Sequence, residues 1–297
     1  MIKKLSVFIF LCIGISSFPR TITDTSETVI LKVLSWNIQM LPNGFDIFSE
    51  SLRKLQHVRV DWIIEHCLAQ DYDIIVFQEV FDVQMKHKIR KHLKSEYPFQ
   101  VNTRTKFGRF TSNGILIVSK LPIKYIDHVI YNRGVHADAW ASKGCTLVEG
   151  EKDGHKFQLA GTHLQAGGSK KAKFHRRSQY KDIAHLIEKN KKDRIPVLVA
   201  GDMNTGNDET EDYRHMLEVM KVFDFPVNDT CPFTIDSNNS WNFNSRSRQL
   251  DYILVQARNT VTRIYNQYIL RLTRDFSGKA TDYSDHYGIV AEIELGN

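Results

Sequence analysis

Short apolar runs rich in β-branched residues recur along the chain and alternate with segments of helical periodicity. The apolar runs are Leu31–Trp36, Asp73–Phe77, Gly114–Ser119, Phe157–Gly161, Pro196–Ala200, Leu250–Val255 and Gly288–Leu295. Runs of this length predict strands buried on at least one face. Helical spacing of apolar residues predicts helices over Val58–Ala69, Val83–Leu93, Ala172–Asn190 and Glu209–Lys221. Asp208 and Glu211 match a capping box that would begin the last helix.

The chain shows no internal boundary after its first residues. Residues 31–295 contain no Gly/Ser-rich or Pro-rich linker and no repeat at a fixed period. We therefore expect a mixed α/β fold in which residues 31–297 form a single domain, preceded by a short N-terminal extension over residues 18–30.

The first 17 residues have the pattern of a secretory signal peptide. Two lysines precede an uncharged apolar run, Leu5–Ile15, which ends in two serines. This run of 11 residues is shorter than the roughly 20 residues that cross a bilayer. We therefore interpret residues 1–17 as a signal peptide and expect a secreted protein.

The composition is that of an ordinary folded protein. The 297 residues are 42% apolar and 25% charged, with 16 Gly and 7 Pro, which excludes collagen-like, low-complexity and disordered classes. Loss of the two signal-peptide lysines lowers the net charge from +6 to +4. A small positive excess suits a membrane surface or a phosphate-bearing substrate and argues only weakly for nucleic acid. Cys67, Cys145 and Cys231 lack CxxC spacing and imply neither a zinc site nor a disulfide scaffold.

Polar side chains gather where predicted strands end. The groups are Ser35-Trp36-Asn37, Phe77-Gln78-Glu79, Gly161-Thr162-His163, Gly201-Asp202-Met203-Asn204 and Ser284-Asp285-His286. Taken singly, each group is more typical of a turn, a helix start or a structural histidine than of catalysis. Together, at strand ends where sheets build active sites, they offer oxygen ligands for a hard divalent cation and two histidines that can move protons near pH 7. This set of residues fits metal-assisted attack on a phosphate ester.

The order of these groups, with Leu250-Asp251-Tyr252 added, resembles the endonuclease/exonuclease/phosphatase superfamily. The resemblance covers nearly all of the mature chain. It implies a DNase I-like fold, a four-layered α/β/β/α sandwich of two packed sheets with helices outside. It also implies a Mg²⁺-dependent phosphodiesterase or phosphatase site at one end of the sheets, so that residues 31–297 form a single catalytic domain.

Finer motifs resemble one branch, the neutral sphingomyelinases, including secreted bacterial sphingomyelinase C. They are Leu41-Pro42, Gln78–Asp82, Ser119–Ile123, Ala137–Gly144 and Gly161–Gln165. We therefore expect hydrolysis of sphingomyelin to ceramide and phosphocholine by in-line attack of an activated water. The alternative is a secreted metal-dependent nuclease of the same fold, which the positive charge favours. A third hypothesis, a binding protein on an inactive scaffold, is disfavoured because drift would break at least one of the groups.

The resemblance and the side-chain chemistry together suggest a metal site. Glu79 is the expected first ligand, because a carboxylate at a strand end offers Mg²⁺ a hard oxygen and leaves room for water and phosphate. Asn37 would assist Glu79, and Asp285 would complete the metal or water network. The expected cofactor is Mg²⁺, with Mn²⁺ and Co²⁺ as alternatives.

Five further residues are expected to carry the acid–base chemistry. Asp202 and Asn204 would position and activate the attacking water. His286 is the expected general base, with Asp251 fixing its tautomer. His163 would stabilise the pentavalent oxyanion or protonate the ceramide alkoxide.

The expected partner is sphingomyelin in a membrane surface, reached by a monomer through peripheral contact and without nucleic acid. The resemblance to the bacterial enzymes implies a membrane-inserting hairpin before the Ser-Asp-His group. Here its expected tip is Asp275–Gly278, and Phe276 is the one aromatic residue in that tip. Six basic residues at helical spacing are expected to lie mostly on one exposed helix face, which would be either a solubilising surface or a patch for anionic lipid or nucleic acid: Lys170, Lys171, Lys173, Arg176, Arg177 and Lys181. Lys143 has two alternative interpretations, a point charge that contacts a phosphate oxygen or a solvated surface lysine.

Overall fold

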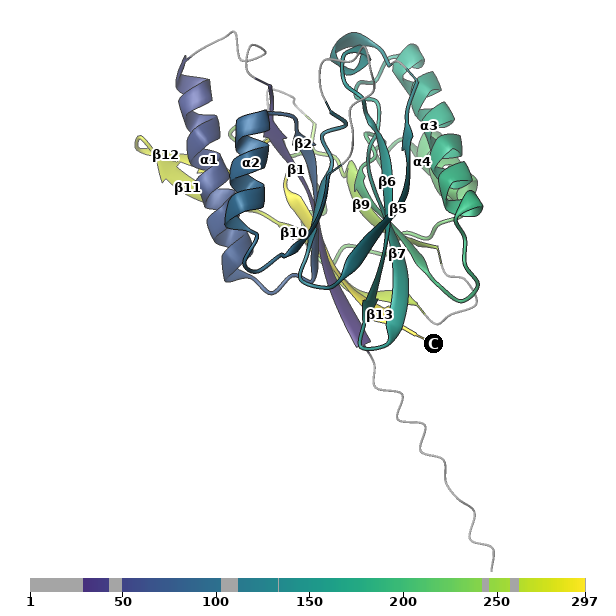
Figure 1. The fold of residues 1–297 in the computed structure, drawn as a ribbon. Coiled ribbons are helices and arrows are strands. Elements are labelled where there is room, and N and C mark those ends of the chain that lie inside the picture. The colour runs from purple at the N-terminus through teal and green to yellow at the C-terminus, as the bar shows by residue number, and fades with distance from the viewer. Residues whose placement is uncertain are drawn as a thin grey trace, which may run out of the picture.

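The computed structural model describes residues 29–42, 50–102, 112–132, 134–241, 246–256 and 262–296 (Figure 1). The predicted signal peptide, residues 1–17, lies outside these ranges, as does all of the extension except Val29 and Ile30. Among the described residues, no helix combines the length and the apolar character needed to span a membrane.

Two sheets form the centre of the fold. The first has the strand order β10 (Arg263–Leu270), β13 (Gly288–Leu295), β1 (Val29–Met40), β2 (Ile74–Val80), β4 (Leu116–Ser119) and β3 (Phe99–Asn102). The second has the order β5 (Ile123–Ile130), β6 (Gly144–Lys152), β7 (His155–His163), β8 (Val197–Asp202) and β9 (Asp251–Gln256). A separate hairpin pairs β11 (Thr273–Phe276) with β12 (Lys279–Asp282).

Helices cover the outer face of each sheet (Figure 1). They are α1 (Glu50–Ala69) and α2 (Val83–His92) beside the first sheet, and α3 (Lys170–Lys189) and α4 (Thr210–Met220) beside the second. A short 3₁₀ helix, η1 (His136–Ala139), precedes β6. This arrangement confirms the expected four-layered α/β/β/α sandwich.

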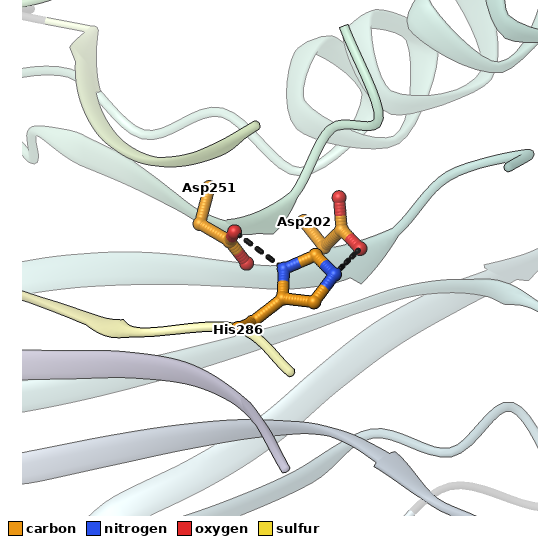
Figure 2. Close-up of side chains that lie close together, drawn as sticks. All are labelled: Asp202, Asp251 and His286. Carbon is orange, nitrogen blue, oxygen red and sulfur yellow. Dashed lines mark hydrogen bonds and ion pairs between the residues drawn. The ribbon is translucent and has the colours of Figure 1, made fainter. Parts of the chain in front are cut away.

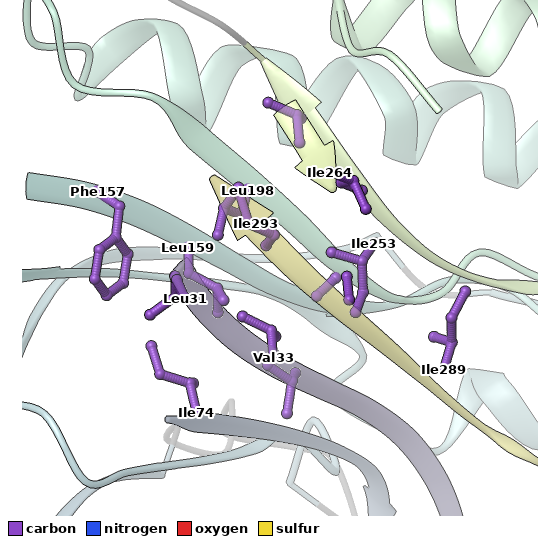
Figure 3. Packing of buried hydrophobic residues seen from close by; sticks show 14 of the residues in the cluster. Leu31, Val33, Ile74, Phe157, Leu159, Leu198, Ile253, Ile264, Ile289 and Ile293 are labelled. Atoms are coloured by element: carbon purple, nitrogen blue, oxygen red, sulfur yellow. The ribbon is translucent and has the colours of Figure 1, made fainter. Parts of the chain in front are cut away.

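The alternation of side chains along β1 explains how the layers form. Leu31 and Val33 belong to the core between the two sheets, where they meet Leu159 and Leu198 of the second sheet (Figure 3). Trp36, at the opposite parity, belongs to the core between the first sheet and α1. Because successive side chains of a strand point to opposite faces, one strand contributes to both cores.

Strand register brings the predicted polar groups to one end of the sandwich. β1 and β2 are parallel, with Asn37 opposite Gln78. β7 and β8 are also parallel, with His163 opposite Asp202, and antiparallel β9 places Asp251 opposite the same aspartate. Parallel neighbours end at the same edge of a sheet, so these side chains collect there.

All seven predicted strands and all four predicted helices are present. The apolar patterns missed β3, β5, β6, β10, β11 and β12. β5 is an edge strand whose residues are all half-buried or exposed, so it lacks the apolar run that marks a central strand. The capping-box prediction was wrong: α4 has Glu209 at its N-cap with no side-chain cap, and Asp208 instead accepts hydrogen bonds from Arg248.

Candidate active site

Asn37 links the two sheets at the centre of the site. It lies near the end of β1, and its amide nitrogen donates to Glu79 Oε1 at 3.2 Å and to Asp202 Oδ2 at 3.1 Å. Asn37 and Asp202 are buried, whereas the Glu79 side chain is partly exposed. One amide therefore holds two carboxylates from different sheets in the same space.

His286 sits between two aspartates, as Figure 2 shows. Its Nδ1 lies 2.8 Å from Asp251 Oδ2, and its Nε2 lies 3.9 Å from Asp202 Oδ2. Burial lowers the pKa of His286, but the charges of Asp251 and Asp202 more than offset burial and hold this pKa well above its ordinary value. Burial and the Asp251 charge raise the pKa of Asp202 to about 7. The two aspartates can therefore orient the His286 ring and make it a stronger base.

His163 is a second buried histidine with the opposite electrostatics. Its Nε2 lies 3.4 Å from Asp202 Oδ2 and 3.8 Å from Glu79 Oε1. Burial, followed by the nearby charges of Lys143 and His286, holds the pKa of His163 well below its ordinary value. A neutral ring at this place favours hydrogen bonding to a phosphate oxygen over release of a proton.

Lys143 is not a solvated surface lysine. Its side chain is only 5% exposed, and its Nζ lies 2.9 Å from His163 Nε2 and 2.8 Å from Asp138 Oδ1. It also donates to the carbonyl oxygen of Leu164 at 2.9 Å. This ammonium therefore adds a fixed positive charge beside His163.

Asn204 and Asp285 complete the set of predicted residues. The Asn204 backbone N–H donates to Asp202 Oδ1 at 2.8 Å, and its side chain donates to the Leu164 carbonyl oxygen at 3.2 Å. Asp285 Oδ2 accepts a 2.8 Å hydrogen bond from Gln39 Nε2. After burial, the charge of Asp285 is the next cause that raises the pKa of Glu79.

Three residues of this region have a left-handed backbone. The φ angles are 48° at Gln39, 56° at Glu79 and 48° at Asn204. Such angles are uncommon outside glycine, and they concentrate at functional sites. Gln39 and Glu79 are the penultimate residues of β1 and β2, and Asn204 follows the end of β8.

The donor set fits a hard divalent cation. Glu79 and Asp285 are mutually repelling carboxylates that offer hard oxygen ligands. Asn37 faces Glu79 with its amide nitrogen, and its amide oxygen accepts a 3.2 Å hydrogen bond from the Gln39 backbone N–H. Asp202, Asp251 and His286 also have ligand atoms within 4.8 Å of one another. Because His286 Nδ1 is already hydrogen-bonded to Asp251, and Mg²⁺ prefers oxygen, the first group is the better fit for Mg²⁺ and the second for acid–base work.

Two expectations about the surface were wrong. Arg176 is buried, while Lys173 and Arg177 pair with acidic residues around α4, so the six basic residues do not form one free cationic face. The predicted hairpin is present, because β11 and β12 pair Phe276 with Lys279 across the turn at Ser277 and Gly278. Phe276 is nevertheless not an exposed anchor, because its half-buried ring packs edge-on against Trp62 of α1 with the centroids 6.3 Å apart.

Sequence reasoning did not consider two residues that contact this site. Gln39 binds Asp285, and Arg59 of α1 binds Gln39 at 3.1 Å. A signal for Arg59 was available, because it occupies a helical position in line with buried Gln56 and Ile63. A charged side chain in a buried stripe requires a partner.

Comparisons with known proteins agree with this geometry. The model of the Endonuclease/Exonuclease/phosphatase family matches residues 34–286. A sphingomyelinase C of Leptospira interrogans is 31% identical over 301 residues, covering 90% of this chain and 52% of that protein. A sphingomyelinase C of Bacillus cereus is 28% identical over 314 residues, covering 92% and 91%. A solved structure of a beta toxin mutant from Staphylococcus aureus with bound magnesium ions matches with a TM-score of 0.73 at 25% identity, covering 89% of this chain and 99% of that chain. This chain spans about half the length of the two Leptospira relatives at 31% identity.

Proposed function

The chain belongs to the endonuclease/exonuclease/phosphatase family, and from this premise we propose that it is a secreted, Mg²⁺-dependent sphingomyelin phosphodiesterase. The observation that carries the proposal is the meeting of the Asp251–His286 pair with Asp202 and the Asn37–Glu79 pair at one end of the sandwich. The choice of sphingomyelin is supported by relatives named sphingomyelinase C at 28% and 31% identity. Secretion is supported by the sequence pattern of residues 1–17.

The metal would be held by Glu79 and Asp285, and Asn37, whose amide nitrogen donates to Glu79, would assist by positioning that carboxylate. When bound, it would supply Lewis-acid stabilisation of charge on the phosphate oxygens. Burial and the Asp285 charge raise the pKa of Glu79, which indicates that this pocket disfavours unbalanced negative charge. A divalent cation is the charge that would balance it.

His286 would act as the general base toward water. The Asp251 carboxylate accepts a 2.8 Å hydrogen bond from the Nδ1–H group, which leaves Nε2 as the basic nitrogen. Asp202 Oδ2 lies 3.9 Å from Nε2, so a water bound between them would be held by both. Asn204 is fixed to Asp202 through its backbone and would help to orient the phosphate or the water.

His163 would act on the phosphate itself. Burial and the Lys143 charge keep its ring neutral. In the structure Nε2 accepts a hydrogen bond from the Lys143 ammonium, and it would donate to a developing oxyanion in the tautomer that carries the proton on Nε2, with Lys143 turned toward the phosphate. In the structure Lys143 contacts both His163 and Asp138, and these contacts fix the position of the His163 ring. Attack by water breaks the bond to the ceramide oxygen, and the proton taken by His286 balances the proton that the ceramide alkoxide gains.

Contact with the membrane would be peripheral and made by a monomer. The mature charge of +4 favours anionic lipid surfaces, to which each nearby basic residue adds about 1 kcal/mol. Two large aromatic side chains are exposed, Trp140 at 53%, shortly before Lys143 in the chain, and Phe174 at 70%, on α3. Since Phe276 is packed against Trp62, these residues are the better candidates for interfacial contact.

The direct test uses purified mature protein with three substrates, sphingomyelin, phosphatidylcholine and plasmid DNA, each with Mg²⁺ and with EDTA. We expect phosphocholine from sphingomyelin only when Mg²⁺ is present. A His286→Ala variant should lose this activity, and His185→Ala, an exposed histidine of α3, is the matched control that should retain it. Cleavage of DNA without phosphocholine release would replace the proposal with the nuclease.

A further inference from the structure

Arg59 is a buried cation on the face of α1 that packs against the first sheet. It is 1% exposed, and its Nη2 donates to the carbonyl oxygens of Ile38 at 3.0 Å and Gln39 at 2.8 Å. Its guanidinium lies 4.5 Å from the centre of the Trp241 ring. Burial lowers the pKa of Arg59 to about 10, while Asp285 and Glu79 oppose this shift. A buried charge is costly unless it is paired, so Arg59 needs an explanation.

The side chain of Gln39 connects Arg59 to the site. Arg59 Nη1 donates to Gln39 Oε1 at 3.1 Å, and Gln39 Nε2 donates to Asp285 Oδ2 at 2.8 Å. A guanidinium only donates hydrogen bonds, so it requires the oxygen of the Gln39 amide on its own side. The amide nitrogen must then face Asp285. Arg59 thereby sets the orientation of the group that holds the carboxylate.

The other oxygen of Asp285 is also held. Ser284 Oγ lies 3.2 Å from Asp285 Oδ1 and 2.8 Å from the carbonyl oxygen of Asn37, so its single hydroxyl proton is shared between two acceptors and the shorter contact is to Asn37. The Asp285 side chain is therefore tied from Ser284 on its own loop and from Gln39 at the end of β1. Of these two contacts, only the one through Gln39 depends on a charged side chain, Arg59 of α1.

We propose that Arg59 is a positioning residue that acts through Gln39 to fix Asp285 for a divalent cation. The inference rests on the metal site of the proposed function and adds two residues to it. Residues that orient a metal ligand through hydrogen bonds change metal affinity by about 10- to 100-fold when they are removed. A residue that only fastens α1 to β1 would change stability and leave metal affinity as it was.

The test measures Mg²⁺ binding by calorimetry, without substrate, in Gln39→Leu, Arg59→Met and the double variant. We expect each single variant to weaken Mg²⁺ binding by about 10-fold or more. Because both changes interrupt one chain of contacts, the double variant should bind Mg²⁺ no more weakly than the weaker single variant. Gln39→Leu leaves the bonds from Arg59 to the backbone carbonyls in place, so it tests the inference even if Arg59→Met fails to fold.

Gln56→Leu is the matched control, since Gln56 is a buried glutamine of α1 that donates to the Leu41 carbonyl oxygen at 3.2 Å and contacts none of these groups. Its Mg²⁺ affinity should equal that of the wild type. Unchanged affinity in folded Gln39→Leu, or losses that multiply in the double variant, would overturn the inference alone. A wild-type protein that binds no Mg²⁺ would overturn the metal site of the proposed function as well.

Discussion

Replacing Asp251 with asparagine should separate the two effects of this carboxylate on His286. The carboxylate oxygen lies 2.8 Å from Nδ1, and Asp251 is fully buried. Opposite unit charges about 3 Å apart attract by about 5 kcal/mol at an effective dielectric constant near 20. One pKa unit corresponds to about 1.4 kcal/mol, so even a fraction of this attraction shifts the pKa of His286 by more than about one unit.

The sign of the change follows from the role of His286 as a base. Activity is lost as pH falls through its pKa, and the pKa of His286 is well above the ordinary value of 6.5, so the acidic limb of the wild-type profile should lie above pH 6.5. Asp251→Asn lowers that pKa and should move the limb to lower pH. The asparagine can also support the wrong tautomer, so kcat/KM should fall by about 10²- to 10⁴-fold.

The assay is phosphocholine release at saturating Mg²⁺ between about pH 5 and pH 9. Asp224→Asn is the control, because Asp224 is a partly buried aspartate that accepts a 2.6 Å hydrogen bond from Tyr213 and lies outside the site. Its pH profile should match the wild type. An Asp251→Asn profile whose acidic limb stays at the wild-type pH would remove Asp251 from any electrostatic role toward His286.

Three further outcomes are expected. Glu79→Gln should keep its melting temperature yet lose activity by more than about 10²-fold, and near-normal rates at saturating Mg²⁺ would refute the ligand assignment. The pKa values of Glu79 and Asp202 are raised, so these two groups bind more protons in the metal-free folded state than in the unfolded state from about pH 4 upward, and their contribution to the free energy of unfolding should fall as pH rises through about pH 7. Mg²⁺ should therefore raise the melting temperature more at pH 8 than at pH 5.5, and an equal increment would contradict this linkage. Phe276→Ala should lower the melting temperature, because the ring packs on Trp62, and should reduce activity on vesicles and on a soluble short-chain substrate alike; a loss confined to vesicles would restore the role of a membrane anchor.

The strand-end rule explains why much of the site could be predicted from the sequence. Asn37, His163 and Asp202 follow apolar runs that became central strands, and the parallel register of β1 with β2 and of β7 with β8 brought their ends together. β5 escaped notice because an edge strand carries a weaker apolar pattern. The six basic residues were misjudged because the acidic partners of Lys173 and Arg177 come from α4, whose position beside α3 is not encoded in local periodicity.

The buried cations show what a search of strand ends cannot find. Glu79 and Asp202 have raised pKa values because burial leaves their charges poorly solvated, and such a group of carboxylates requires positive charge from elsewhere. Lys143 supplies it from the segment before β6, and Arg59 supplies it from the middle of α1. Neither position follows a strand. Arg59 could still have been found, because a charge among the buried positions of a helix is stable only beside a partner of opposite charge. The sequence already predicted such a partner, the cluster of acidic residues at the strand ends.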